Sequence, residues 1–204
     1  MQSVAEIYEE ARRYFRGEGV LNHTLARLVT DLRQHDIDYL VIGAVALMAY
    51  GYPRFTEDID IIVTPKGLQK FHDELIGLGY APAFVGARKR LKSTRDGTPI
   101  ELITAGEYPG DGKPKPVAFP DPMDAAHEID GINYPTVEKL VELKLASGMT
   151  APDRLKDLAD VQELIKFRGL TSEFAEGLNP YVRDKYFELL HGVEQGSTND
   201  FEEQ

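Results

Sequence analysis

The amino-acid sequence predicts an α+β fold, in which a small mixed β-sheet is flanked by helices and followed by a C-terminal helical bundle. The first observation is at residues 38–63, where two apolar runs of strand length enclose a glycine turn and a short helix-favouring stretch. The second is the further alternation of helical and strand patterns up to residue 104. The third is the helical spacing of apolar residues after residue 135. Such an order favours a sheet covered by helices.

Four regions are expected along the 204 residues, which suffice for one compact domain with an appendage or for two small domains. They are N-terminal packing helices (1–36), an α/β core ending in a Pro/Gly-rich loop (37–120), a C-terminal helical region (121–192) and a disordered tail (193–204). The tail is expected to be disordered because its residues lack apolar periodicity.

The composition is that of an ordinary soluble protein, with 42% hydrophobic and 28% charged residues. The sequence has no apolar run of about eighteen residues and no signal-peptide pattern, so we expect a cytoplasmic protein without a membrane partner. It has no cysteine, and its five histidines lack ligand-like spacing, which argues against disulfides and a zinc site. The net charge of −11 argues against broad binding of nucleic acid, but it allows a local basic patch.

Local signals define the elements on either side of the central segment. Residues 3–16 and 21–35 are expected to be helices, because both carry apolar residues at helical spacing and Ser3 can cap the first. Thr64 and Pro65 form an N-cap and first-turn pair that begins another helix. Three strand-length segments follow, at residues 80–85, 88–93 and 98–104.

Two carboxylates lie inside a segment that otherwise suits a buried strand. Asp58 and Asp60 flank Ile59, and the two-residue period of a strand puts both carboxylates on one face. Asp is depleted in strands, and adjacent carboxylates raise each other's pKa unless a cation lies between them. Mg²⁺ resolves this conflict, because it usually binds through one or two carboxylates and substrate phosphates. A solvated Asp pair at the end of a strand is the alternative.

Gly43 and Ala44, at the turn 15 residues upstream of Asp58, supply the complementary half of a site. A glycine between strand and helix lets backbone N–H groups approach an anion, and the helix start favours negative charge. An anion cradle that faces a dicarboxylate metal site is what phosphoryl or nucleotidyl transfer requires. Arg54 and Thr56 lie between the two parts, which favours the functional interpretation.

The Gly43-Ala44 turn followed by Asp58-Ile59-Asp60 resembles the signature of the polymerase-beta-like nucleotidyltransferase superfamily, a Gly-Gly or Gly-Ser turn before an Asp-x-Asp. The longer string is most similar to the AbiEii-like branch, which includes toxins of toxin–antitoxin pairs. The resemblance covers roughly residues 37–167, and its motifs are specific as a set. It implies the nucleotidyltransferase fold. One departure is Ala44, which keeps a backbone N–H but has no Ser hydroxyl.

Glu101 is a further carboxylate in an apolar segment, since it lies between apolar residues where a strand is expected. In the resembled superfamily a third carboxylate lies on the strand beside the Asp pair, and Glu101 fits this position. The resemblance therefore implies a metal site of Asp58, Asp60 and Glu101 for Mg²⁺ or Mn²⁺. The superfamily more often has Asp there, and an edge-strand Glu that faces solvent is the alternative.

Five cations occur within the eight residues from Arg88 to Arg95. In a strand, Arg88, Arg90 and Lys92 share one face, which makes them candidates for contacts with a triphosphate or an RNA backbone. An edge strand protected by charge against aggregation is an equally good interpretation.

Residues 105–122 are rich in proline and glycine, so they form no helix or strand interior, although an ordered loop is compatible with them. Long loops of this kind are functional or act as linkers. We expect the boundary between the α/β core and the helical region here. A simple linker is the favoured interpretation, and a loop that folds over the site with Lys113 and Lys115 is the other.

Thr136 is expected to cap a helix that carries Lys144 on a largely apolar flank. An ordinary snorkelling lysine would explain that residue. The stretch from Lys144 through Arg154 to Asp157 and Asp160, however, resembles the second sequence block of AbiEii-like nucleotidyltransferases. The resemblance implies that Lys144 neutralises the triphosphate and that Arg154 contacts phosphate. Asp157 or Asp160 would orient these cations.

With the resemblance, these residues predict Mg²⁺-dependent transfer of a nucleoside monophosphate from a nucleoside triphosphate to an acceptor hydroxyl, with release of pyrophosphate. The expected catalytic residues are Asp58, Asp60, Glu101 and Lys144, and the expected nucleotide-binding residues are Gly43, Ala44, Arg54, Thr56, Lys144, Arg154 and Asp157. The acceptor is open between tRNA or other RNA, a small molecule and a protein, and a toxin would also have a cognate antitoxin. A catalytically lapsed nucleotide-binding or partner-binding module is the alternative, because Ala44 and Glu101 depart from the pattern.

Overall fold

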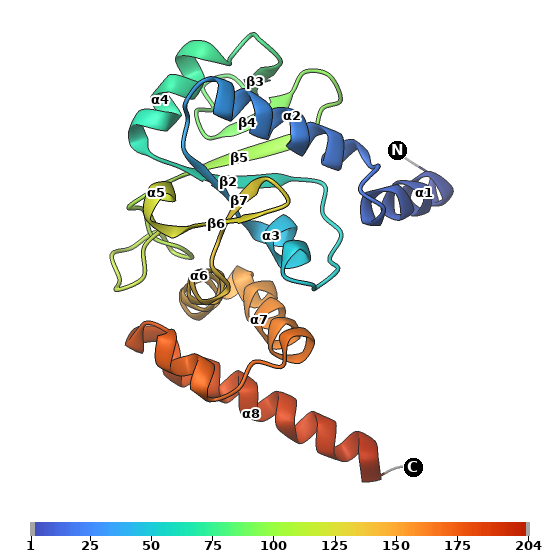
Figure 1. The fold of residues 1–204 in the computed structure, drawn as a ribbon, viewed down its shortest axis with the longest axis vertical. Helices are drawn as coiled ribbons and strands as arrows, with labels where there is room; N and C mark the ends of the chain where they lie inside the picture. Colours follow the sequence, from blue (N-terminus) through green and yellow to red (C-terminus); the bar gives the residue numbers. More distant parts are fainter. Residues whose placement is uncertain (1–2, 203–204) are drawn as a thin grey trace.

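A five-stranded sheet forms the centre of the N-terminal part of the computed structural model, which describes residues 3–202 and side chains as far as residue 196 (Figure 1). Its strands are β1 (Tyr39–Val41), β2 (Ile59–Val63), β3 (Tyr80–Pro82), β4 (Arg90–Ser93) and β5 (Pro99–Thr104). They lie in the order β1-β2-β5-β4-β3, with β2 and β5 parallel and the other neighbours antiparallel. The predicted mixed sheet is confirmed.

Helices flank this sheet, and its strand β2 is almost completely buried. The flanking helices are α2 (Val20–Gln34), α3 (Gly43–Ala49) and α4 (Pro65–Glu74). Ile61 and Ile62 of β2 point to opposite faces of the sheet, and both are fully buried. Leu28 and Leu32 of α2 belong to the same core. A strand that is covered on both faces reads as a nearly continuous apolar run, and in β2 only Asp60 interrupts that run.

The first helix, α1 (Val4–Phe15), forms as predicted but differs from the expected packing helix. Its apolar residues Val4 and Tyr8 are 69% and 70% exposed. Tyr14 is the residue of α1 that enters the core. The apolar periodicity correctly predicted the helix and its apolar face. It could not predict whether another element covers that face, because the pattern contains no information about tertiary contacts.

A short helix and a hairpin follow the Pro/Gly-rich loop. They are α5 (Pro122–Ala125), β6 (Ala126–Ile129) and β7 (Ile132–Pro135). The strand β7 packs against β1, and the Tyr50 hydroxyl donates a hydrogen bond to the Pro135 carbonyl at 2.6 Å. Residues 121–135 therefore lie with the α/β part, although the sequence pattern groups them with the helical region. Strands of four residues give too short a pattern to fix that assignment.

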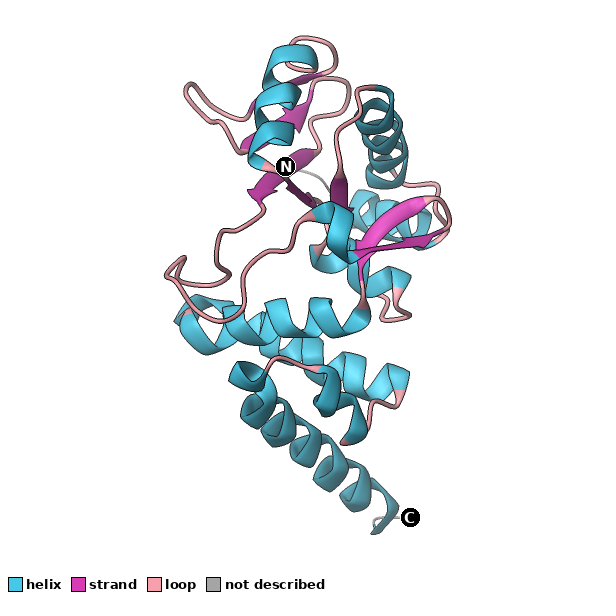
Figure 2. Cartoon of the chain, turned by 60° about the vertical axis from the view of Figure 1, so that its left-hand side comes forward, coloured by secondary structure: helices cyan, strands magenta, loops and turns pink. Residues whose placement is uncertain are grey.

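Three helices form the predicted C-terminal bundle. They are α6 (Val137–Thr150), α7 (Leu155–Arg168) and α8 (Pro180–Glu202), with 3-10 helices at Pro152–Arg154 and Glu173–Gly177 between them. α6 is buried on all sides from Leu140 to Ser147, because it lies between the sheet and the other two helices (Figure 2). No helix in the described part of the chain is long and apolar enough to cross a membrane.

The helix α8 continues to Glu202, through most of the segment 193–204 that was expected to be a disordered tail. Residues 203–204 lie outside the described residues. Packed side chains such as Tyr186 fix the beginning of α8, and each further residue then adds one hydrogen bond without a new nucleation cost. The absence of apolar periodicity therefore did not mark the end of the helix.

Candidate active site

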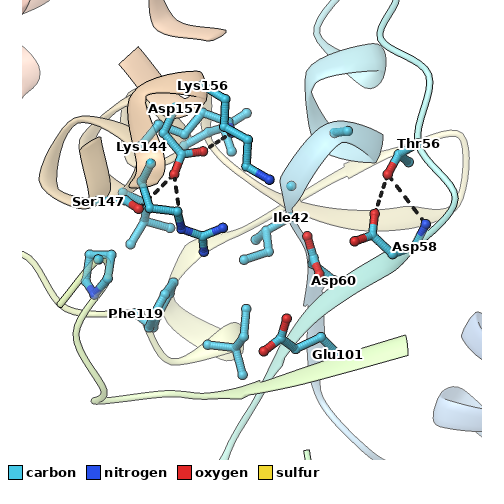
Figure 3. Close-up of a pocket in the computed structure, with 18 of the residues that line it drawn as sticks. Ile42, Thr56, Asp58, Asp60, Glu101, Phe119, Lys144, Ser147, Lys156 and Asp157 are labelled. Atoms are coloured by element: carbon cyan, nitrogen blue, oxygen red, sulfur yellow. Dashed lines mark hydrogen bonds and ion pairs between the residues drawn. The ribbon is translucent and has the colours of Figure 1, made fainter. Parts of the chain in front are cut away.

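A cavity of about 760 Å³ opens between the sheet and the helices α6 and α7 (Figure 3). Its walls come from the start of α3, the segment before β2, β5, the loop after β5, α6 and the start of α7. All the residues predicted to be catalytic or nucleotide-binding line this cavity: Gly43, Ala44, Arg54, Thr56, Asp58, Asp60, Glu101, Lys144, Arg154 and Asp157. The fold thus brings together two sequence blocks that are far apart in the chain.

Carboxylates gather at the sheet side of the cavity. Asp60 on β2 and Glu101 on β5 are register partners in the parallel pair, so both side chains leave the same face of the sheet. Asp58, just before β2, points into the same cavity. Burial raises the pKa of Asp60 to about 6, and the charges of Asp58 and Glu101 add to this effect. A cation bound here would relieve the repulsion that the sequence predicted.

Gly43 lies directly against one of these carboxylates. Its φ is +67°, a left-handed conformation that favours glycine. A Cβ atom at this position would lie 2.3 Å from Oδ2 of Asp60. The neighbouring Ile42 N–H donates a hydrogen bond to the Asp60 carbonyl at 2.9 Å. The glycine turn and the Asp-x-Asp strand therefore form one packed unit, and the glycine is needed to leave room for the carboxylate.

Replacing Gly43 by Ala should destabilise the protein by about 2–4 kcal/mol, because it combines backbone strain of roughly 1–2 kcal/mol with a displaced Asp60 side chain. Urea unfolding measures the effect. Gly112→Ala is the matched control, since Gly112 also has a positive φ, +71°, but a Cβ there would meet no atom within 4 Å. Equal losses in the two variants would contradict the contact between Gly43 and Asp60.

The cations at the helical side of the cavity are held by buried carboxylates. Lys144 of α6 is only 6% exposed, so it does not snorkel to the surface. Its Nζ donates to Oδ2 of Asp160 at 2.7 Å and to Oδ1 of Asp157 at 3.0 Å. Arg54 Nη1 donates to the same Asp160 Oδ2 at 2.6 Å. Asp160 is therefore shared by a cation of the helical bundle and a cation of the segment before β2.

Asp157 organises the second group on this side (Figure 3). It accepts a hydrogen bond from Ser147 Oγ at 2.7 Å, and Arg154 Nε lies 3.7 Å from the same carboxylate oxygen. Burial acts to raise the pKa of Asp157, but the Lys144 charge and the hydrogen bonds outweigh it and hold the pKa below its usual value. The lowered pKa favours the ionised form of Asp157, which lies between Lys144 and Arg154.

The donor set at the sheet side suits a hard divalent cation such as Mg²⁺ or Mn²⁺, because Asp58, Asp60 and Glu101 offer only carboxylate oxygens. Among the residues that the structure describes, however, no three His, Asp or Glu side chains already have a metal-binding arrangement. The Thr56 hydroxyl donates a hydrogen bond to Oδ1 of Asp58. Binding by all three carboxylates would therefore require their side chains to rearrange.

The predicted basic row of Arg88, Arg90 and Lys92 lies outside the cavity. Arg88 donates to the Gln69 side chain at 3.0 Å, whereas Arg90 and Lys92 lie exposed on β4. Lys89, which alternation puts on the other face, lines the cavity. The two-residue alternation correctly put Arg90 and Lys92 on one face of β4. The cation that lines the cavity, Lys89, belongs instead to the irregular segment before that strand.

Several residues of the cavity wall were not predicted as site residues. They are Glu57, Lys89, Glu107, Tyr108, Phe119, Ser147 and Lys156. Ser147 lies three residues, or about one helical turn, after Lys144, and this spacing was the signal that could have found it. Tyr108 and Phe119 belong to the Pro/Gly-rich loop, whose position no periodic pattern predicts.

A second cavity, of about 670 Å³, adjoins the first and shares Phe55, Thr56, Glu57 and Pro99 with it. Its far side is formed by α1 and the turn before β5. The charged residues that line this far side are Glu6, Glu9, Glu10, Arg13 and Asp96. The space next to the three carboxylates of the first cavity is thus bordered by further carboxylates.

A mixed sheet with carboxylates on neighbouring parallel strands, a glycine turn beside them and a helical bundle across the cavity is the nucleotidyltransferase fold. The solution structure of the antibiotic-resistance factor ANT(2'')-Ia matches with a TM-score of 0.52 and 15% sequence identity, over 84% of this chain and 96% of that chain. At this identity the match shows the fold.

Two further solved structures match less closely. ANT(2'')-Ia in complex with adenylyl-2''-tobramycin matches with a TM-score of 0.49 and 14% identity, over 85% of this chain and 97% of that one. An antigenic nucleotidyltransferase-like protein from Paracoccidioides brasiliensis matches with a TM-score of 0.46 and 15% identity, over 71% and 74% of the two chains. No family model and no curated protein matches the sequence.

Proposed function

We propose that the chain is a nucleotidyltransferase, which transfers a nucleoside monophosphate from a nucleoside triphosphate to an acceptor hydroxyl and releases pyrophosphate. The observation that carries this proposal is the pairing of Asp60 with Glu101 on parallel strands, in one cavity with the buried Lys144. Carboxylates on one side and cations on the other are complementary to a metal-bound triphosphate.

Asp58, Asp60 and Glu101 would hold Mg²⁺ or Mn²⁺, which supplies charge neutralisation and polarises a phosphate oxygen when bound. The remaining chemistry belongs to the chain. Lys144 and Arg154 offset the charge of the triphosphate, and the backbone N–H of Ala44 donates to a phosphate oxygen. An oxygen of the acceptor attacks the α-phosphorus as the bond to pyrophosphate breaks, and its proton passes to a carboxylate such as Glu101.

The acceptor is a hydroxyl of a small molecule, of RNA such as tRNA, or of a protein. The carboxylates of the adjoining cavity favour a small acceptor with positive charge over an RNA backbone. The exposed Arg90 and Lys92 on β4 favour RNA instead. Of these acceptors, RNA is the one that fits the toxin role implied by the resemblance, and a toxin would have a cognate antitoxin as its partner.

Transfer of label from α-labelled ATP, CTP, GTP or UTP tests the proposal. The pure protein with Mg²⁺ should label the RNA, protein or small-molecule fraction of a cell extract, whereas Asp58→Asn and Asp60→Asn should lose this label. Asp184→Asn, at an exposed position of α8, is the matched control and should label as the wild type does.

A binding-only module is the second candidate, and the departures at Ala44 and Glu101 favour it. It would bind nucleotides with an affinity that Mg²⁺ does not change, and it would transfer no label. Retention of full Mg²⁺-dependent transfer by Asp60→Asn would show instead that the site is assigned wrongly.

A further inference from the structure

One wall of the main cavity has no role in the proposed reaction. It is formed by the loop between β5 and α5 together with α6, and its residues are Tyr108, Pro109, Phe119, Leu140 and Leu143. Figure 3 shows Phe119 at the end of the cavity where Ser147 and Lys144 lie, across from Thr56 and Asp58. This wall is apolar and aromatic, whereas the proposed metal and phosphate sites are charged.

The two ends of the loop are joined by backbone hydrogen bonds, which hold the Phe119 backbone beside Gly106 and Glu107. The Gly106 N–H donates to the Phe119 carbonyl at 2.8 Å, and the Phe119 N–H donates to the Glu107 carbonyl, also at 2.8 Å. The Glu107 carboxylate forms an ion pair with Lys89 before β4. The segment expected to be a linker is therefore attached to the sheet.

The tip of the loop is attached to α6. The buried Nζ of Lys115 donates to the Pro109 carbonyl and, at 3.2 Å, to Thr150 Oγ1. At Gly110 the backbone approaches the helix so closely that a Cβ atom would lie 2.2 Å from Thr150 Oγ1 and 2.8 Å from the Ser147 carbonyl oxygen. Lys115, a candidate for folding over the site, thus holds the loop and does not line the cavity.

We propose that this wall is the nucleobase subsite, in which the base of the nucleoside triphosphate stacks on Phe119, with Tyr108 of the same loop as its second aromatic contact. This inference rests on the proposed function, because it assigns the remaining part of the same substrate. A nucleoside triphosphate consists of a charged phosphate chain and a flat base, and the cavity has a charged part and an aromatic part. The Phe119 ring offers no hydrogen bond, so it contributes affinity for any base and not base selection.

The chain contains no tryptophan, so Phe119→Trp introduces a single tryptophan at the proposed subsite, whose fluorescence can be excited selectively over that of the ten tyrosines. Stacking of a base on this ring should quench its fluorescence when ATP, CTP, GTP or UTP is added with Mg²⁺. Inorganic tripolyphosphate, which carries the charges without a base, should leave the fluorescence nearly unchanged. Quenching of equal size by tripolyphosphate would overturn the subsite.

Affinities provide an independent measurement with the wild-type fold. Phe119→Leu should weaken nucleotide binding about tenfold, in line with the loss of one base-aromatic stack, and should leave tripolyphosphate binding unchanged. Phe187→Leu is the matched control, because Phe187 is a half-exposed phenylalanine on α8 outside the cavity. It should change neither affinity. Thermal unfolding of each variant verifies that it is folded.

The outcomes separate this inference from the proposed function. If the wild type binds neither nucleotide nor tripolyphosphate, the proposed function fails and the subsite fails with it. If the wild type binds nucleotides and Phe119→Leu binds them equally well, the nucleobase subsite alone is overturned. A parallel loss of nucleotide and tripolyphosphate affinity in Phe119→Leu would also overturn it, because such a loss would come from the phosphate site.

Discussion

Replacing Asp60 by Asn is expected to stabilise the metal-free protein at neutral pH and, at the same time, to lower nucleotidyl transfer by about 100-fold or more. Burial and the neighbouring carboxylates raise the pKa of Asp60 from 3.8 to about 6, so its ionised form is destabilised in the folded protein. The shift corresponds to roughly 3 kcal/mol, and solvent near the cavity reduces the expected gain to about 1–2 kcal/mol. Urea unfolding at pH 7.5 in the presence of a chelator measures this gain.

The gain should depend on pH in a defined direction. Because the folded protein holds the Asp60 proton more tightly than the unfolded chain, its contribution to stability is fully present below about pH 4 and is lost as the pH rises through about 6. The difference in unfolding free energy between Asp60→Asn and the wild type should therefore grow between pH 4 and pH 6.5. Mg²⁺ should stabilise the wild type and not the variant.

Asp58→Asn is the control for this prediction. Asp58 is exposed and accepts a hydrogen bond from Thr56, so its substitution should change the free energy of unfolding by less than about 1 kcal/mol. If Asp60→Asn destabilised the protein, or if its gain in stability did not vary with pH, the raised pKa of Asp60 would be contradicted.

Replacing Lys144 by Met is expected to destabilise the protein by about 3–5 kcal/mol, the largest loss of stability among the substitutions considered. The Nζ of Lys144 is the cation that Asp157 and Asp160 share. Removing it leaves two buried carboxylates whose remaining polar partners, among the described residues, are Arg54, Arg154 and Ser147. Removing one partner of a buried ion pair typically destabilises a protein by about 3–5 kcal/mol, because the other charge is left uncompensated. Urea unfolding at pH 7.5 is again the measurement.

The loss should shrink in acid and in a double variant. The lowered pKa of Asp157 stabilises the fold above about pH 4, and this stabilisation is lost as the pH falls. Adding Asp157→Asn to Lys144→Met should restore part of the stability, because Asp157 is the carboxylate left poorly compensated, with Arg154 Nε 3.7 Å away, whereas Asp160 keeps its ion pair with Arg54. Lys166→Met, in an exposed pair with Glu163 on α7, is the control and should cost less than about 1 kcal/mol. If the stability losses of the two single substitutions simply added up in the double variant, the residues would not be coupled in one ion-pair network.

The sequence predicted the parts of this site whose signals are local. Asp58 and Asp60 were identifiable because carboxylates are unusual in a buried strand, and Gly43 because a turn between strand and helix favours glycine. Their contact could not be predicted in detail, since the packing of Gly43 against the Asp60 carboxylate depends on the pairing of β1 with β2. Glu101 required the resemblance as well as the strand pattern.

What the sequence could not predict depends on tertiary contacts. The loop 105–122 has the composition of a linker, and its position on α6 is determined by Gly110 and the buried Lys115, neither of which forms part of a periodic pattern. The apolar stripe of α1 looked like a packing face, but it is largely exposed. The sharing of Asp160 by Arg54 and Lys144 joins residues from three separate elements, which no single window of sequence contains.

The ion pair between Arg54 and Asp160 determines how the chain can be divided. Arg54 comes before β2, and Asp160 lies on α7, so any fragment that ends before α6 keeps the three carboxylates but loses Lys144 and the partner of Arg54. Such a fragment would retain the acidic half of the cavity without its neutralising half. We therefore expect that neither the sheet nor the helical bundle, expressed alone, forms the complete cavity, and that an exchange with another chain preserves it only if both halves are moved together.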